Sequence, residues 1–185
     1  MTETVDWRAL AEKLGTISWT DGGRSETGGT KVGCDAIIEI LGDTLLRDAV
    51  DFYVSGEAGN EVARSVLMLL QPPAAMERCL EIFRAPCDEQ EAADAINLLK
   101  MVADRRVLDW IPEFMASETV GVRVWTLGIL DQLLIMQEAI TPEEAVPFFK
   151  QALADSDKNV RDQAAQFLDD FADHDHVIAI RRLMQ

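Results

Sequence analysis

Cysteine is scarce in this sequence. Cys34, Cys79 and Cys87 form an odd and sparse set among 185 residues. A secreted disulfide framework uses a dense and even set, so we expect reduced thiols. Cys79 shares a helical apolar stripe with Met76 and Phe83 and is expected to be a small core side chain.

Histidine is nearly absent, with His174 and His176 as its two occurrences. No Ser-His-Asp order and no G-x-S-x-G elbow appears, and no histidine lies near a cysteine in the sequence, so nucleophilic catalysis is not indicated. The stretch Asp173-His174-Asp175-His176 holds ligand types that suit zinc. It lies between two expected helices, and we interpret it as a solvated turn, with a metal site as the alternative.

Basic residues are half as frequent as acidic ones. The chain has 17 lysines and arginines against 33 aspartates and glutamates, a net charge of −16 and a pI near 4.4. Nucleic acids and anionic membranes bind positively charged surfaces, so neither is an expected partner. A basic protein partner remains compatible with this charge.

Long apolar segments are also missing. The longest aliphatic run covers residues 66–70, far below the roughly 20 residues that span a bilayer. The first 14 residues carry Glu3, Asp6 and Glu12 without the apolar stretch of a signal peptide. We therefore expect a soluble, cytoplasmic protein.

Glycine is concentrated in one segment, because six of the eleven glycines fall within residues 15–33. We predict a long loop there. Residues 1–30 are thus expected to form an N-terminal helix with a glycine-rich loop, and residues 31–185 a helical domain. The spacing of Gly23 and Gly28 is that of a phosphate-binding loop, but Gly29 and Thr30 replace the required Lys-Ser/Thr pair, so a flexible loop is favoured.

The remaining sequence follows the 3.6-residue helical period, with short turns between segments. Thr141-Pro142-Glu143-Glu144 has the composition of a capping box, and Asp88 with Glu91 repeats it without proline. The expected helices are 5–14, 31–41, 44–54, 60–71, 73–84, 89–103, 105–116, 120–136, 142–154, 159–172 and 176–184.

These helices repeat. The apolar positions Val160, Ala164, Phe167, Leu168 and Phe171 correspond, 38 residues earlier, to Val122, Thr126, Ile129, Leu130 and Leu133. Weaker copies are offered by Ala95, Leu98, Leu99 and Val102 and by Val62, Val66, Leu69 and Leu70. A helical hairpin repeated every 30 to 40 residues buries its apolar stripe by stacking on its neighbours. The expected fold is all-α, a short α-solenoid (α-α superhelix) of about five helical hairpins.

Residues 105–172 resemble HEAT repeats most clearly. The resemblance rests on Trp110-Ile111-Pro112-Glu113-Phe114-Met115 followed by Val122-Arg123, and on Phe148-Phe149 followed by Val160-Arg161. It implies that a second-helix arginine (Arg123, Arg161) pairs with an aspartate in the turn of an adjacent repeat (Asp155, Asp157). It also implies first helices that are kinked at proline, here Pro112 and Pro147, and second helices that line a concave surface.

Trp125 stands where the neighbouring repeats have Gln163 and Asp94, and Val124 stands where the next repeat has Asp162. Polar residues at the equivalent positions indicate a surface site, where tryptophan could anchor a partner. The alternative is that Trp125 packs against a neighbouring helix or under the glycine-rich loop.

Acidic residues accumulate near the C-terminal end, with nine acids against three bases between Thr141 and Asp175. Asp162, Asp169 and Asp173 share a polar side with Gln166. The resemblance would make the concave surface locally acidic, although a solvated face that only maintains solubility is also compatible.

The sequence therefore predicts a non-catalytic protein-binding module without cofactor or metal, one form being an inhibitor or immunity-type protein that masks a cationic enzyme. The alternatives are an enzyme or metal protein that uses the glycine-rich loop or Asp173–His176, and a repeat protein that holds a small pigment or ligand. The oligomeric state is not indicated. The expected docking residues are Asp94, Arg123, Val124, Trp125, Asp162, Gln166, Asp169 and Asp173.

Overall fold

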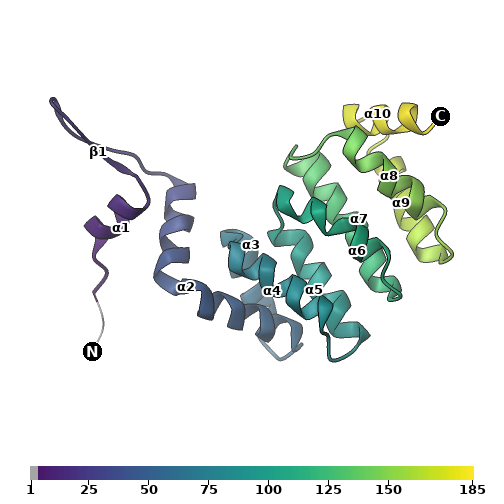
Figure 1. The fold of residues 1–185 in the computed structure, drawn as a ribbon, viewed down its shortest axis with the longest axis horizontal. Coiled ribbons are helices and arrows are strands. Elements are labelled where there is room, and N and C mark those ends of the chain that lie inside the picture. The colour runs from purple at the N-terminus through teal and green to yellow at the C-terminus, as the bar shows by residue number, and fades with distance from the viewer. Residues whose placement is uncertain (1–3) are drawn as a thin grey trace. The chain divides into compact units, whose positions relative to one another are not determined.

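The computed structural model describes residues 4–185, which form ten α-helices and one two-stranded sheet (Figure 1). The all-α prediction is thereby confirmed. The chain divides into two compact units, one ending at Ala75 and the other beginning at Met76, whereas the sequence analysis placed the change of organisation near residue 30. Within the described residues, no helix combines the length and the apolar character that a bilayer crossing requires.

The first unit contains α1 (Trp7–Lys13), β1 (Ile17–Thr20), β2 (Gly23–Glu26), α2 (Thr30–Val54) and α3 (Asn60–Leu70). Helix α1 is capped by the Asp6 carboxylate, which accepts a hydrogen bond from the Ala9 amide at 3.0 Å. None of its residues is buried, and it contacts α2 only lightly.

The glycine-rich segment is not the simple loop that the sequence analysis predicted. Ile17 pairs with Glu26 and Thr20 with Gly23 in an antiparallel hairpin closed by two residues, Asp21 and Gly22. The missed signal was the Asp-Gly dipeptide between two short segments, which is typical of hairpin turns. Gly23, at φ 114°, supplies backbone freedom that other residues lack.

Helix α2 bends sharply in the middle, as Figure 1 shows. Gly42 has φ 72° and ψ 163°, a conformation that only glycine adopts without strain. The two halves agree with the separate helices expected at 31–41 and 44–54. The bend is therefore encoded by a single residue.

Helix α4 (Pro73–Arg84) leads into the second unit. Its further elements are α5 (Glu89–Val102), the 3₁₀ turn η1 (Arg105–Asp109), α6 (Ile111–Met115), α7 (Val120–Asp131), the π-helical segment η2 (Gln132–Met136), α8 (Pro142–Leu153), α9 (Lys158–Asp170) and α10 (Asp175–Met184). The helix expected at 105–116 is broken before Pro112, which occupies the first turn of α6, whereas α8 continues through Pro147. The Thr141–Glu144 capping box is confirmed.

The helices of the second unit contact one another in two series. Helix α7 contacts α5 and α9, while α8 contacts α6 and α10. The core between them contains the fully buried Phe114 and Phe149, and the rings of Phe149 and Phe167 stack with centroids 4.8 Å apart. Helices α5 and α7 approach so closely that a Cβ at Gly121 would lie 3.0 Å from the Cβ of Ala93.

The apolar stripe of α3 departs from the repeat template. The template predicts a packed stripe, and Leu70 is buried accordingly, but Val62 is 69% exposed and Leu69 is 65% exposed. Val66 is also exposed, at 38%. Burial in α3 falls instead on Leu67 and Leu70, so the apolar residues of this helix face two directions.

Candidate functional site: the second-helix face

The expected docking residues come mainly from α5, α7 and α9, which contact one another in that order. The 38-residue offset between α7 and α9 matches Val124 with Asp162, and the 31-residue offset between α5 and α7 matches Asp94 with Trp125. We define the second-helix face as the half-buried or exposed side chains at these matched positions: Asp94, Val124, Trp125, Asp131, Asp162, Gln166 and Asp169.

Arg123 does not belong to this face, which corrects its assignment as a docking residue. It is 9% exposed, and its Nε and Nη2 atoms donate to the two carboxylate oxygens of Asp155 at 2.9 and 3.0 Å. Its Nη1 donates to the carbonyls of Ser117 and Glu118 at 2.7 and 3.1 Å. Because the fork of donors is used within the chain, Arg123 joins two successive turns rather than a partner.

The same local geometry recurs one repeat later. Arg161 Nη1 donates to the carbonyls of Asp155 and Ser156 at 2.6 and 2.8 Å, again six and five residues before the arginine. The pairing of Arg123 with Asp155 that the resemblance implied is present. Asp157 instead caps α9, where its carboxylate accepts from the Asn159 amide at 2.8 Å.

Asp155 is held in its ionised form. Burial alone would raise the pKa of this carboxyl, but hydrogen bonds from Arg123 and from the Asp157 amide outweigh burial and bring the pKa below its ordinary value. The Arg123–Asp155 pair thus fixes the spacing between the turn before α7 and the turn before α9.

The exposed acids of α9 have partners within the chain. Asp162 pairs with Lys158 one turn earlier, and Asp169 pairs with Arg181 of α10 at 2.8 Å. Gln166 donates to Asp170 at 3.3 Å. These solvent-exposed contacts are individually weak, so an incoming cation can replace them at small cost.

Asp94 and Asp173 lie at the two ends of the predicted set. Asp94 is half-buried on α5 and accepts a hydrogen bond from Gln90 at 3.0 Å. Asp173 is exposed in the turn that follows α9. The structure thus brings the residues of α5, α7 and α9 onto stacked helices and leaves Asp173 beyond them.

Trp125 packs in part against a neighbouring helix, as the alternative interpretation proposed. The Lys100 ammonium of α5 lies 4.6 Å from the centroid of its ring, a cation–π distance. The Lys100 chain also covers Gly128, where a Cβ would lie 2.6 Å from Lys100 Cδ. The indole remains half-exposed, so it can still contact a partner.

Asp131 was missed by the sequence analysis. It ends α7 just before the π-helical segment, and its Oδ1 is buried without a hydrogen-bond partner in the described part of the chain. Burial raises the pKa of this carboxyl, while the nearby Lys100 charge opposes the rise. The repeat offset that matches Asp131 with Asp169 was the available signal.

The aspartate–histidine stretch does not assemble a metal site. The ring of His174 caps α10 by accepting from the His176 amide at 3.3 Å, and His176 Nδ1 lies 2.8 Å from the Leu134 carbonyl oxygen. Over residues 4–185, no three or more histidine, cysteine or acidic side chains converge as metal ligands would. The histidines have structural roles at the start of α10.

The thiol of Cys87 is exposed, and hydrogen bonding and charge from Glu91 raise its pKa. A reactive cysteine needs the opposite shift. Cys79 is buried, as expected for a core side chain.

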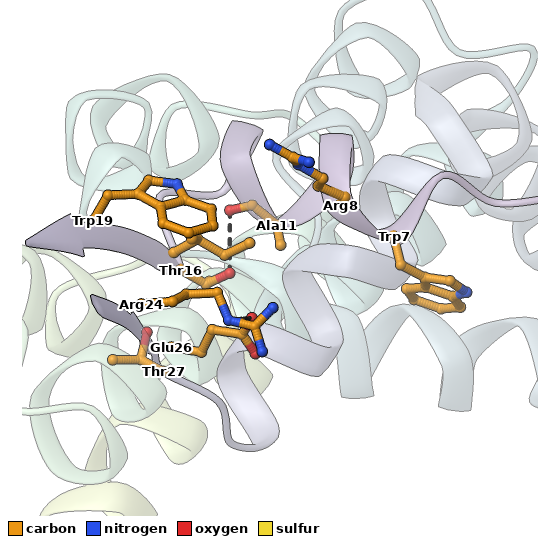
Figure 2. A pocket seen from close by; sticks show the side chains of 9 residues that line it. Trp7, Arg8, Ala11, Thr16, Trp19, Arg24, Glu26 and Thr27 are labelled. Atoms are coloured by element: carbon orange, nitrogen blue, oxygen red, sulfur yellow. Dashed lines mark hydrogen bonds and ion pairs between the residues drawn. The ribbon is translucent and has the colours of Figure 1, made fainter. Parts of the chain in front are cut away.

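The former candidate for phosphate binding forms one wall of an open pocket of about 320 Å³ in the first unit. Figure 2 shows Trp19, Arg24 and Glu26 from the hairpin gathered near Thr16, with the indole of Trp7 at the other end of the group. Arg24 pairs with Glu26 at 2.9 Å, and the Arg8 guanidinium lies 6.0 Å from the Trp19 ring centroid. Since Gly23–Glu26 is a strand, it does not cradle phosphate with its backbone amides.

Comparison of the chain with family models, with curated proteins and with solved structures finds no match. The functional argument therefore rests on the residues and contacts described above.

Proposed function

We propose that this protein is a non-catalytic protein-binding module, a short HEAT-like α-solenoid whose acidic second-helix face engages a basic protein partner. Two features support the solenoid interpretation. Helices α5, α7 and α9 contact one another in order, and Arg123 and Arg161 repeat one hydrogen-bond pattern at the starts of α7 and α9.

The observation that carries the proposal is the unsatisfied carboxylate of Asp131 on the same face as Trp125. A buried acceptor without a partner costs roughly 1 to 3 kcal/mol, and an arginine or lysine of a bound protein would remove that cost. Tryptophan beside such an acceptor is a frequent centre of protein interfaces. Asp162 and Asp169 extend the acidic surface along α9.

The net charge of −16 supports the same partner chemistry, because long-range attraction accelerates the encounter with a basic surface. One concrete form is an inhibitor or immunity-type protein that covers a cationic enzyme by presenting carboxylates where phosphate would bind. The three free thiols accord with a reducing compartment such as the cytoplasm.

Affinity capture from the native lysate tests this proposal, with the yield of captured protein measured at low and high salt. Asp162→Lys reverses a charge on an exposed residue of the face, and Asp21→Lys makes the same change in the exposed hairpin turn as a matched control. We expect Asp162→Lys to reduce the yield of a salt-sensitive basic partner several-fold and Asp21→Lys to leave it unchanged.

Trp125→Ala removes the proposed anchor and should weaken capture about tenfold or more. Its circular dichroism must match that of the unmodified protein, because Trp125 is half-buried. Equal capture by all variants would refute the assignment of this face.

A further inference from the structure

The first unit carries a surface that the proposed function does not use. Val62, Val66 and Leu69 follow one another at helical spacing on the outside of α3, and all three are exposed. Phe52 of α2 extends this row, because its ring lies 3.8 Å from the position of a Cβ on Gly59, which precedes Val62 by three residues. We call these four residues the α3 stripe.

The α3 stripe is about 15 Å long, from the helical rise between positions 59 and 69. Apolar residues spaced three and four apart on an exposed helix are the pattern by which one amphipathic helix receives another. An exposed row of this kind is unfavourable in water unless a partner covers it.

The charges around the stripe select the partner. Glu57 and Glu61 flank its beginning on α3, and Asp43, Asp48 and Asp51 are exposed on the second half of α2. The two arginines of the same region are Arg47 and Arg64, of which Arg64 pairs with Glu61. A second copy of this chain would bring an identical acidic border against the first, and like charges oppose that contact.

We propose that the α3 stripe binds an amphipathic helix with leucine-type residues on one side and lysine or arginine along its borders. This site lies in the first unit and is independent of the second-helix face. The partner helix would cover Val62, Val66 and Leu69 while its basic residues meet the acidic border.

A fluorescent synthetic peptide of about 14 residues, built from leucine and lysine at helical spacing, probes the site by fluorescence anisotropy with the full chain. Two companion peptides separate the contributions. One replaces every lysine by glutamate, and the other keeps the leucine–lysine composition in an order without a helical stripe. We expect both to bind at least tenfold more weakly than the first peptide.

Val62→Ser with Leu69→Ser removes the two most exposed side chains of the stripe and should weaken the basic amphipathic peptide about tenfold or more. Met136→Ser with Leu183→Ser is the matched control, because these residues of the second unit are 67% and 44% exposed. Trp125→Ala should also leave peptide binding unchanged, which separates this site from the second-helix face.

Three results would overturn the inference. The first is equal binding of the ordered and disordered basic peptides, and the second is unchanged binding by the Val62/Leu69 variant. The third is a dimer in sedimentation that the same variant dissociates, since a second copy would then be the occupant.

Discussion

The Arg123–Asp155 pair allows the most quantitative prediction. Both side chains are nearly buried, at 11% and 10% exposed, and the two bonds between them have good geometry. Asp155→Ala would leave Arg123 Nε and Nη2 without acceptors in a poorly hydrated place. Breaking a buried pair in this way costs about 3 kcal/mol, a large part of a typical stability of roughly 5 to 15 kcal/mol.

A double-mutant cycle with Arg123→Met and Asp155→Ala, followed by urea unfolding and circular dichroism, measures the coupling directly. We expect a coupling free energy of about 2 kcal/mol. The Arg84–Glu113 pair is the internal control, because it has similar bidentate geometry but exposed side chains, and its coupling should stay below about 1 kcal/mol. Equal coupling in the two pairs would refute the reasoning that burial makes the first pair structural.

The pair also predicts an acid limit. The folded pKa of Asp155 is below its ordinary value of 3.8, so the stability it contributes is present above that pH and disappears as the pH falls further. Unfolding midpoints of the unmodified protein and of Asp155→Ala should converge at the acid end of this window. A constant difference at all pH values would contradict the assignment.

Three further variants test separate parts of the structure by urea unfolding. Asp131→Asn should stabilise the protein by up to about 1 kcal/mol at neutral pH. Because burial raises the folded pKa of Asp131, this gain should vanish as the carboxyl protonates near and below its ordinary value of 3.8, and destabilisation at neutral pH would contradict it. Gly42→Ala should cost about 1 to 3 kcal/mol, since alanine is strained at φ 72°, and a neutral effect would mean that α2 is not bent there. Thr141→Ala should cost about 1 kcal/mol through loss of the α8 capping box, and no change would show that the cap is dispensable.

Most helices could be predicted because their signals are local. The caps at Asp88 and Thr141 and the apolar periods in α7 and α9 fixed positions that the structure reproduces within a few residues. The hairpin was missed because glycine content was weighed above the Asp21-Gly22 turn signal.

Side-chain orientation was harder to predict than helix position. The repeat offset matched Arg123 with Arg161, but it could not tell that Arg123 turns inward to Asp155 while Trp125 remains half-exposed. The same offset marked Val62 and Leu69 as packed, although α3 buries Leu67 and Leu70 instead. A helical period locates a stripe, whereas its burial depends on which neighbouring helix covers it.

The most direct test of partner binding through the second-helix face is site-specific photocrosslinking in the native lysate. A benzophenone amino acid at Gln166 on α9 is compared with one at Glu143 on α8, since both positions are exposed. The account predicts a crosslinked basic protein from position 166 that disappears at high salt, and none from position 143. Crosslinks from both positions alike, or from position 143 alone, would contradict it.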